Sequence, residues 1–233
     1  MSDWFGPEEM QAISLSLKVA LWAVVLSLPF GIFTAYALAR WQFRGKQLLN
    51  GFVHLPLILP PVVTGYLLLL LFGRRGPVGA WLEETLGLVL AFRWTGAVLA
   101  AAIMAFPLMV RAIRLAIEAV DPRLEEAAAT LGARRLAVFT TITLPMILPG
   151  IITGAILAFA KAMGEFGATI TFVSNIPGQT QTLPSAIYAF LQVPGGEASA
   201  LRLVLISVAI ALGALFFSEY LSRRATARIG NGQ

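Results

Sequence analysis

The sequence predicts an all-α integral membrane protein in which the 233 residues form a single transmembrane domain (1–233). The chain is 58% hydrophobic, only 12% of its residues are charged, and its mean hydropathy is +0.81, which is atypical of a soluble domain. A helix of about 20 apolar residues can cross the hydrocarbon layer of a membrane. Five apolar stretches are predicted to do so, at residues 13–39, 51–73, 94–117, 142–173 and 201–221.

The first two stretches differ in regularity. Residues 19–39 carry no charge, and Pro29 is expected to kink this helix near its middle. The second stretch contains the adjacent prolines Pro60 and Pro61, which disfavour helix before them. Broken backbone at membrane depth must be buried in protein or line a water-filled cavity. Pro60 and Pro61 are therefore predicted to line a path through the membrane rather than to face lipid.

Small residues mark helix faces that are expected to pack closely. In the third stretch Ala97, Ala101 and Ala105 recur every four residues, and the fifth stretch repeats the spacing with Ala209 and Gly213. Such faces let two membrane helices approach each other closely.

A polar segment at residues 122–141 interrupts the apolar stretches and is predicted to form two short helices. Asp121 suits the N-cap of the first helix, and Pro122 suits its first position. Gly132 suits the left-handed residue that ends a helix, so the chain is expected to turn there and begin the second.

The positions of the Lys and Arg residues predict the orientation of the chain. Most of these 17 residues fall in 40–50, 111–141 and 221–233, which alternating spans place on one side of the membrane. Because basic loops stay in the cytoplasm, the N-terminus is predicted outside and the C-terminus inside. Arginines that flank apolar spans indicate orientation in a membrane rather than a nucleic-acid partner.

The sequence also excludes several classes of function. It has no Cys and a single His, His54, which leaves little material for a thiolate or His-pair metal site or for a nucleophile–base pair. The nucleotide-binding pattern G-x-x-x-x-G-K-[ST] is absent. The sequence thus predicts no catalytic residues, no metal and no cofactor, and the chain is not expected to be an enzyme.

The polar segment matches the pattern E-A-A-x3-G-x9-I-x-L-P at every defined position, from Glu126 through Gly132 to Pro145. This pattern resembles the signature of ABC importer permeases, and five spans with this segment before the fourth resemble the type I permease core. The resemblance implies that the two short helices are cytoplasmic coupling helices that sit on an ATP-binding subunit. An ordinary loop helix with a glycine cap explains Gly132 but not the full spacing. The implied ATPase-coupling residues are Glu125, Glu126, Ala127, Ala128, Gly132, Leu144 and Pro145.

Further runs resemble the molybdate permease family and extend the resemblance over nearly the whole chain. These runs are residues 54–66, 73–76, 106–112 and 164–178, the last shared in looser form with sulfate permeases. The resemblance implies ATP-driven import of molybdate across the bacterial cytoplasmic (inner) membrane. It also implies a homodimer of this chain, two ATP-binding subunits and a periplasmic or lipid-anchored molybdate-binding protein. Tungstate or sulfate/thiosulfate is the alternative substrate in this class, and a passive anion channel is the alternative outside it.

Lys161 and Glu165 are two charged residues within the fourth stretch, four residues apart. Charges at membrane depth cost at least ~2.5–3.5 kcal/mol each, so these two are expected to pair and to face the protein interior. The favoured interpretation is a structural ion pair. The alternative is that Lys161 lies on the translocation path and attracts a passing oxyanion, with Glu165 keeping that attraction weak.

Overall fold

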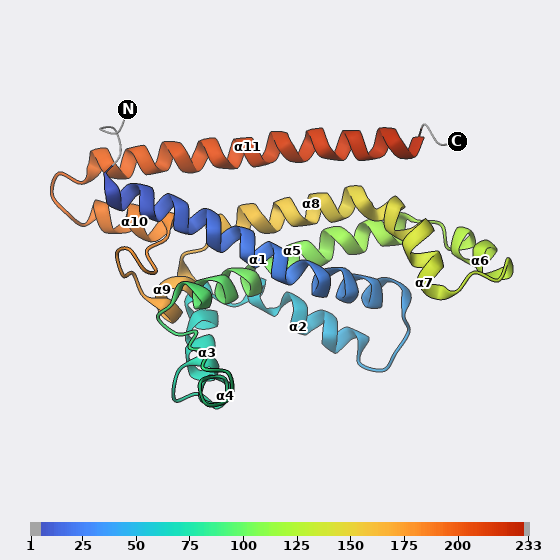
Figure 1. Cartoon of the computed structure of the whole chain (residues 1–233), viewed down its shortest axis with the longest axis horizontal. Helices are drawn as coiled ribbons and strands as arrows, with labels where there is room; N and C mark the ends of the chain where they lie inside the picture. Colours follow the sequence, from blue (N-terminus) through green and yellow to red (C-terminus); the bar gives the residue numbers. More distant parts are fainter. Residues whose placement is uncertain (1–5, 231–233) are drawn as a thin grey trace.

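The computed structural model describes residues 6–230, and these residues form a bundle of helices joined by short connections (Figure 1). The elements in chain order are α1 (Pro7–Arg40), α2 (Lys46–Ile58), α3 (Pro61–Phe72), α4 (Pro77–Leu86), α5 (Trp94–Ala119), α6 (Pro122–Thr130), α7 (Arg135–Val138), the π-helical turn η1 (Phe139–Thr143), α8 (Leu144–Met163), α9 (Gly167–Val173), α10 (Leu183–Leu191) and α11 (Glu197–Gly230).

Four helices are long and apolar enough to cross a membrane: Pro7–Arg40, Trp94–Ala119, Arg135–Met163 and Glu197–Leu221. The pair α2 and α3, bent by 115° at Leu59 and Pro60, is the candidate for a fifth crossing. In Figure 1 the beginning of α1 lies at one end of the bundle, whereas α6, α7 and the C-terminal end of α11 lie at the other. The two termini therefore emerge at opposite ends.

The core lies between α1, α5 and α8, and small side chains form the faces along which these helices approach. Ala97, Ala101 and Ala105 of α5 are fully buried, which confirms the close-packing face expected there. On α8, Gly154 lies so close to α5 that a Cβ at this position would come within 3.1 Å of the Ile113 side chain and the Met109 carbonyl. Small residues thus let these helices approach closely, and buried larger side chains such as Leu38, Met109 and Ile147 fill the rest of the core.

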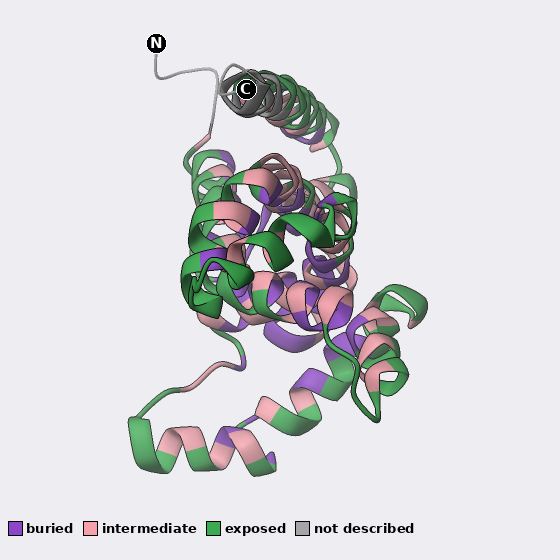
Figure 2. Cartoon of the chain, turned by 90° about the vertical axis from the view of Figure 1, so that its right-hand side faces the viewer, coloured by how far each residue is buried: buried purple, intermediate pink, exposed green. Residues whose placement is uncertain are grey.

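The matching expectation for the fifth stretch is not met within this chain. Ala209 and Gly213 are both exposed on α11, and no atom lies within 4 Å of the Cβ that Gly213 lacks. Figure 2 shows α11 apart from the buried centre of the bundle, with most of its surface exposed. The small-residue face of α11 is therefore open to lipid or to another chain.

The broken parts of the second and fourth stretches pack against each other. α3 begins at Pro61 and lies along α9, where a Cβ on Gly65 would come within 2.5 Å of the Ala168 carbonyl oxygen. A Cβ on Gly167 would likewise lie 2.6 Å from the Pro61 side chain. The prolines thus break the second stretch as predicted, and glycines on both helices allow the close contact.

The fourth stretch differs from the single segment that the sequence predicts. Its helix begins earlier, since α7, η1 and α8 form one unbroken helix over Arg135–Met163. It also ends earlier, because the chain turns at residues 164–166 and α9 starts as a separate helix. Glu165 therefore lies beyond the end of α8 and does not share a continuous helical face with Lys161.

Candidate coupling site and membrane path

The first of the two expected coupling helices, α6, forms as its end residues predict. The Asp121 side chain accepts a hydrogen bond from the Arg123 N–H (2.9 Å), and Pro122 occupies the first turn. At the other end Gly132 adopts φ = +84°, and the Ala133 N–H donates to the Ala128 carbonyl (3.1 Å). This hydrogen bond closes the helix in the manner of a glycine C-cap, so α7 can start three residues later.

Glu125 and Glu126 have different environments although they are neighbours in the sequence. The Glu125 carboxylate is only 17% exposed, accepts a hydrogen bond from Thr143 Oγ1 (2.7 Å) and lies 3.5 Å from the Arg40 guanidinium. Arg40 also donates to the carbonyl of Val120 at the end of α5 (2.9 Å). Glu126, in contrast, is exposed. Glu125 thus faces the membrane bundle, and Glu126 faces away from it.

We call the contacts among Arg40, Glu125 and Thr143 the α6 latch. Arg40 ends α1, Thr143 is the fully buried last residue of η1, and Glu125 is in the first turns of α6. The latch therefore ties α6 to two parts of the bundle, the end of α1 and η1. Arg40 and Thr143 were not identified from the sequence, where Arg40 looks like any arginine at the end of an apolar span.

The other implied coupling residues fall into two groups. Ala127 is exposed and Ala128 half-buried on α6, beside exposed apolar side chains that include Leu131 (89% exposed) and Leu136 (74% exposed). Leu144 and Pro145 instead lie in the first turn of α8, where Leu144 packs against the core. The exposed surface at this end of the molecule thus includes apolar and small residues beside charged ones such as Glu126 and Arg135, and such exposed apolar side chains suit docking by another protein.

Of the four residues suggested for the membrane path, Lys161 and Glu165 are in direct contact, and Pro61 lies near them. Pro61 packs on Gly167, two residues after Glu165, while Pro60 caps the start of α3. Lys161 Nζ lies 2.9 Å from Glu165 Oε2, which confirms the expected pair. The Glu165 carboxylate is 1% exposed, and its other oxygen accepts from the Ala168 N–H (2.9 Å) at the start of α9. This geometry favours the structural interpretation of the pair.

The chain belongs to the family described as binding-protein-dependent transport system inner membrane component, whose sequence model matches residues 27–227. It is thus a multi-pass membrane protein of a transport system. Among curated relatives, it is 62% identical to the molybdenum transport system permease protein ModB of Escherichia coli K12 over 95% of this chain and 97% of that protein. It is 54% identical to ModB of Haemophilus influenzae, over 96% and 98% of the two chains.

More distant relatives and solved structures agree with this family. Sulfate permease 2 of Chlamydomonas reinhardtii is 40% identical over 95% of this chain and 59% of its own length. A bacterial alginate ABC transporter in complex with a pentasaccharide-bound periplasmic protein matches with a TM-score of 0.75 at 20% identity, over 95% of this chain and 80% of that chain. The methionine transporter MetNI matches with a TM-score of 0.66 at 14% identity, over 93% of this chain and 94% of that chain. The fold is that of a type I ABC importer permease.

Replacing Glu125 by Ala is expected to destabilise the protein, because the Arg40 guanidinium and the Thr143 hydroxyl then lose a shared acceptor. Leaving such groups unsatisfied costs about 1–3 kcal/mol. Glu126→Ala is the matched control, since an exposed substitution next to it changes stability by about 0.5 kcal/mol or less. Thermal unfolding of the purified chain in detergent measures the stability of both variants. Equal unfolding temperatures for the two variants would show that the α6 latch does not stabilise the bundle.

Proposed function

We propose that this chain is the membrane-spanning subunit of an ATP-driven importer of molybdate. The observation that carries the proposal is the 62% identity with E. coli ModB over nearly the full length of both chains. The sulfate permease of Chlamydomonas reinhardtii is only 40% identical, so sulfate is the less well supported substrate. Tungstate remains the alternative of the same chemistry as molybdate. The complex contains two copies of this chain, two ATP-binding subunits that hydrolyse ATP, and a periplasmic or lipid-anchored molybdate-binding protein.

In this proposal α6 and α7 dock on the ATP-binding subunit from the cytoplasm. Glu126, Ala127 and the exposed leucines provide the docking surface, while Glu125 holds α6 on the bundle through the α6 latch. Movement of α6 then reaches α1 through Arg40 and α8 through Thr143. The N-terminus lies outside and the C-terminus in the cytoplasm, as the distribution of basic residues favours.

The path for the anion lies where two copies of the chain meet, near the broken helices α3 and α9. Pro60 and Pro61 line this path, because broken backbone at membrane depth is tolerated beside a water-filled cavity. The exposed small-residue face of α11, with Ala209 and Gly213, is available for contact with lipid or with another subunit. Lys161 and Glu165 fix α8 to α9 beside the path rather than bind the anion.

Uptake of labelled molybdate, tungstate and sulfate into proteoliposomes that hold the complete complex tests the proposed function. We expect molybdate uptake to require ATP and the binding protein and to exceed sulfate uptake. A complex with a non-hydrolysable ATP analogue is the control. Uptake at the same rate without hydrolysis would indicate a passive channel, and faster sulfate uptake would assign the other substrate.

Replacing Gly132 by Val is expected to uncouple ATP hydrolysis from transport. A β-branched residue at φ = +84° is strained by ~1–2 kcal/mol, so the turn between α6 and α7 must change shape. Gly195→Val is the matched control, because Gly195 has φ = +83° and an equally open surrounding at the other end of the molecule. Transport-linked ATP hydrolysis measures the effect. If both variants lose hydrolysis to the same extent, strain alone accounts for the loss.

Lys161→Met is expected to lower thermal stability, because it leaves the buried Glu165 carboxylate without its cation. Adding Glu165→Gln removes the unpaired charge, and the amide oxygen can still accept from the Ala168 N–H. The double variant should therefore regain both stability and molybdate uptake. If stability returns and uptake does not, Lys161 acts on the anion and the structural interpretation is wrong.

A further inference from the structure

We propose that a cavity at the end of the bundle opposite α6 and α7 binds a tetrahedral oxyanion dianion before it enters the membrane path. We call this cavity the cationic vestibule. Its volume is about 810 Å³, and its lining includes Lys18 of α1, Arg74 after α3, Arg93 and Trp94 at the start of α5, and Gln179 after α9. The proposal rests on the proposed function and adds a site on this chain for the transported anion.

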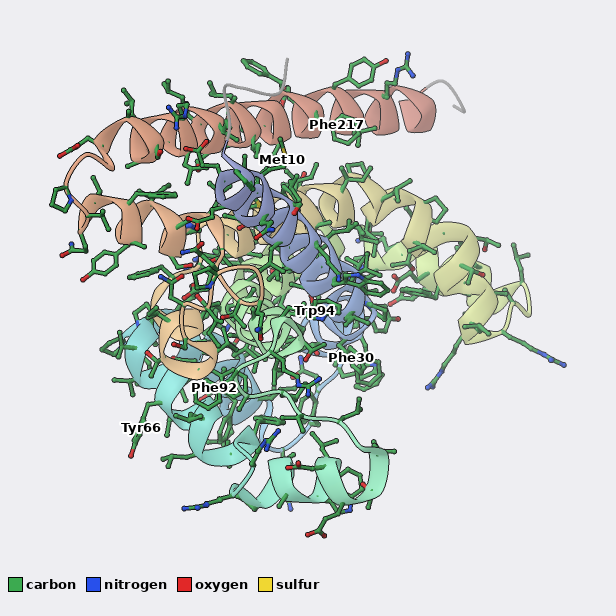
Figure 3. All side chains as sticks on the ribbon, turned by 60° about the vertical axis from the view of Figure 1, so that its left-hand side comes forward. Met10, Phe30, Tyr66, Phe92, Trp94 and Phe217 are labelled. Carbon is green, nitrogen blue, oxygen red and sulfur yellow. The ribbon has the colours of Figure 1, made fainter. Side chains whose placement is uncertain are left out.

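Four separate parts of the chain build the vestibule. In Figure 3 Phe92 and Trp94 lie between the α1 ribbon and the arm formed by α3 and α4. A second cavity of about 240 Å³ shares Lys18 and Gly178 with the vestibule and adds Gln11, Ser14 and Gln181. The polar residues of α1 in this second cavity recur at helical spacing, so a polar face leads along α1 to Lys18.

The charges of the vestibule are of one sign. Three of its lining residues are cationic, and none of its lining residues is Asp or Glu. Arg74 is partly neutralised, since Glu83 lies 3.9 Å away and both side chains are exposed. Lys18 and Arg93 form no ion pair within residues 6–230. A cleft whose lining carries a net charge of one sign concentrates ions of the opposite sign.

Lys18 is held in place by an aromatic ring rather than by a carboxylate. Its Nζ lies 3.7 Å from the centre of the Trp94 ring, a cation–π contact that fixes the ammonium and leaves its positive charge uncompensated. The ammonium, the guanidinium of Arg93 and the amide of Gln179 together offer the hydrogen-bond donors that oxyanion oxygens accept. Because Lys18 and Arg93 are exposed to water, binding is weak enough for release toward the path.

The loops around the vestibule are fixed by backbone contacts. The carbonyl of Ile176 accepts from the N–H groups of Gln179 (3.0 Å), Thr180 (2.9 Å) and Gln181 (3.1 Å), which holds the turn that carries Gln179. The two non-glycine residues with positive φ among residues 6–230 are Phe92 (58°), which lines the vestibule, and Ser174 (67°), two residues before Ile176. Such strained backbone is typical of functional sites and persists only where its surroundings fix it.

The test uses the absence of cysteine from this chain. Gln179→Cys places one thiol in the vestibule, and Gln192→Cys, an exposed residue after α10, is the matched control. The assembled complex reacts with an anionic and a cationic methanethiosulfonate reagent at low ionic strength. We expect the ratio of anionic to cationic rates at residue 179 to exceed that at 192 by about 10-fold, because a charged cleft raises encounter rates by at least this factor. Lys18→Gln with Arg93→Gln should remove the difference.

Binding of molybdate is then measured as protection of the thiol at residue 179 from the methanethiosulfonate reagent. Molybdate, at constant ionic strength set with sodium chloride, should slow the reaction of Gln179→Cys in a saturable way. It should have no effect at residue 192 or in the Lys18→Gln, Arg93→Gln background. Sulfate should protect as well, because the donors recognise tetrahedral charge. Equal slowing by chloride alone, or no slowing by molybdate, would overturn the proposal.

Uptake separates this proposal from the proposed function. The Lys18→Gln, Arg93→Gln complex should take up molybdate several-fold more slowly than the wild-type complex. If the wild-type complex is protected by molybdate but transports none, the vestibule stands and the importer function fails. If the wild-type complex transports molybdate and the double variant does so equally fast, the vestibule proposal fails alone.

Discussion

Every backbone N–H and C=O group at membrane depth must find a partner inside the protein, and this constraint decides where the chain can break. The second and fourth stretches both break, and the breaks lie against each other. At the first, prolines have no N–H groups to leave unpaired. At the second, the buried Glu165 carboxylate accepts from the Ala168 N–H and so starts α9. Glycines at 65 and 167 then allow α3 and α9 to lie in direct backbone contact. The close packing of α1, α5 and α8 provides the support on which these short helices rest.

At the end of the molecule that carries α6, a side chain likewise decides how a short helix is held on the bundle. Two adjacent glutamates on α6 face different surroundings, so Glu125 can hold the helix on the bundle while Glu126 stays exposed to a partner. Glu125 accepts its hydrogen bond from Thr143, which is the fully buried last residue of the π-helical turn η1. π-Helical turns inside longer helices are frequent at functional sites.

Local chemistry could be predicted from the sequence, whereas long-range contacts could not. The start of α6 at Pro122, its end before Gly132 and the break at Pro60 follow from residues that act on their immediate neighbours. Arg40 contacts Glu125, 85 residues away, and nothing near Arg40 distinguishes it from an arginine that anchors a helix in lipid headgroups. The turn at residues 164–166 was missed because apolar residues resume on both sides of it. The small-residue pattern correctly located the packed face of α5, but the same pattern on α11 has no partner within the chain.

The unbroken helix over Arg135–Met163 has a mechanical consequence. The part of it that forms α8 has 20 residues and is about 30 Å long, with one end beside the α6 latch and the other just before α9. Tilting α8 by about 8° around one end moves its other end by about 4 Å. That displacement is comparable to the diameter of a water molecule or of a small anion. Small rotations of α8 at the end beside α6 are therefore geometrically sufficient to displace the segment beside α9, without any helix having to unfold.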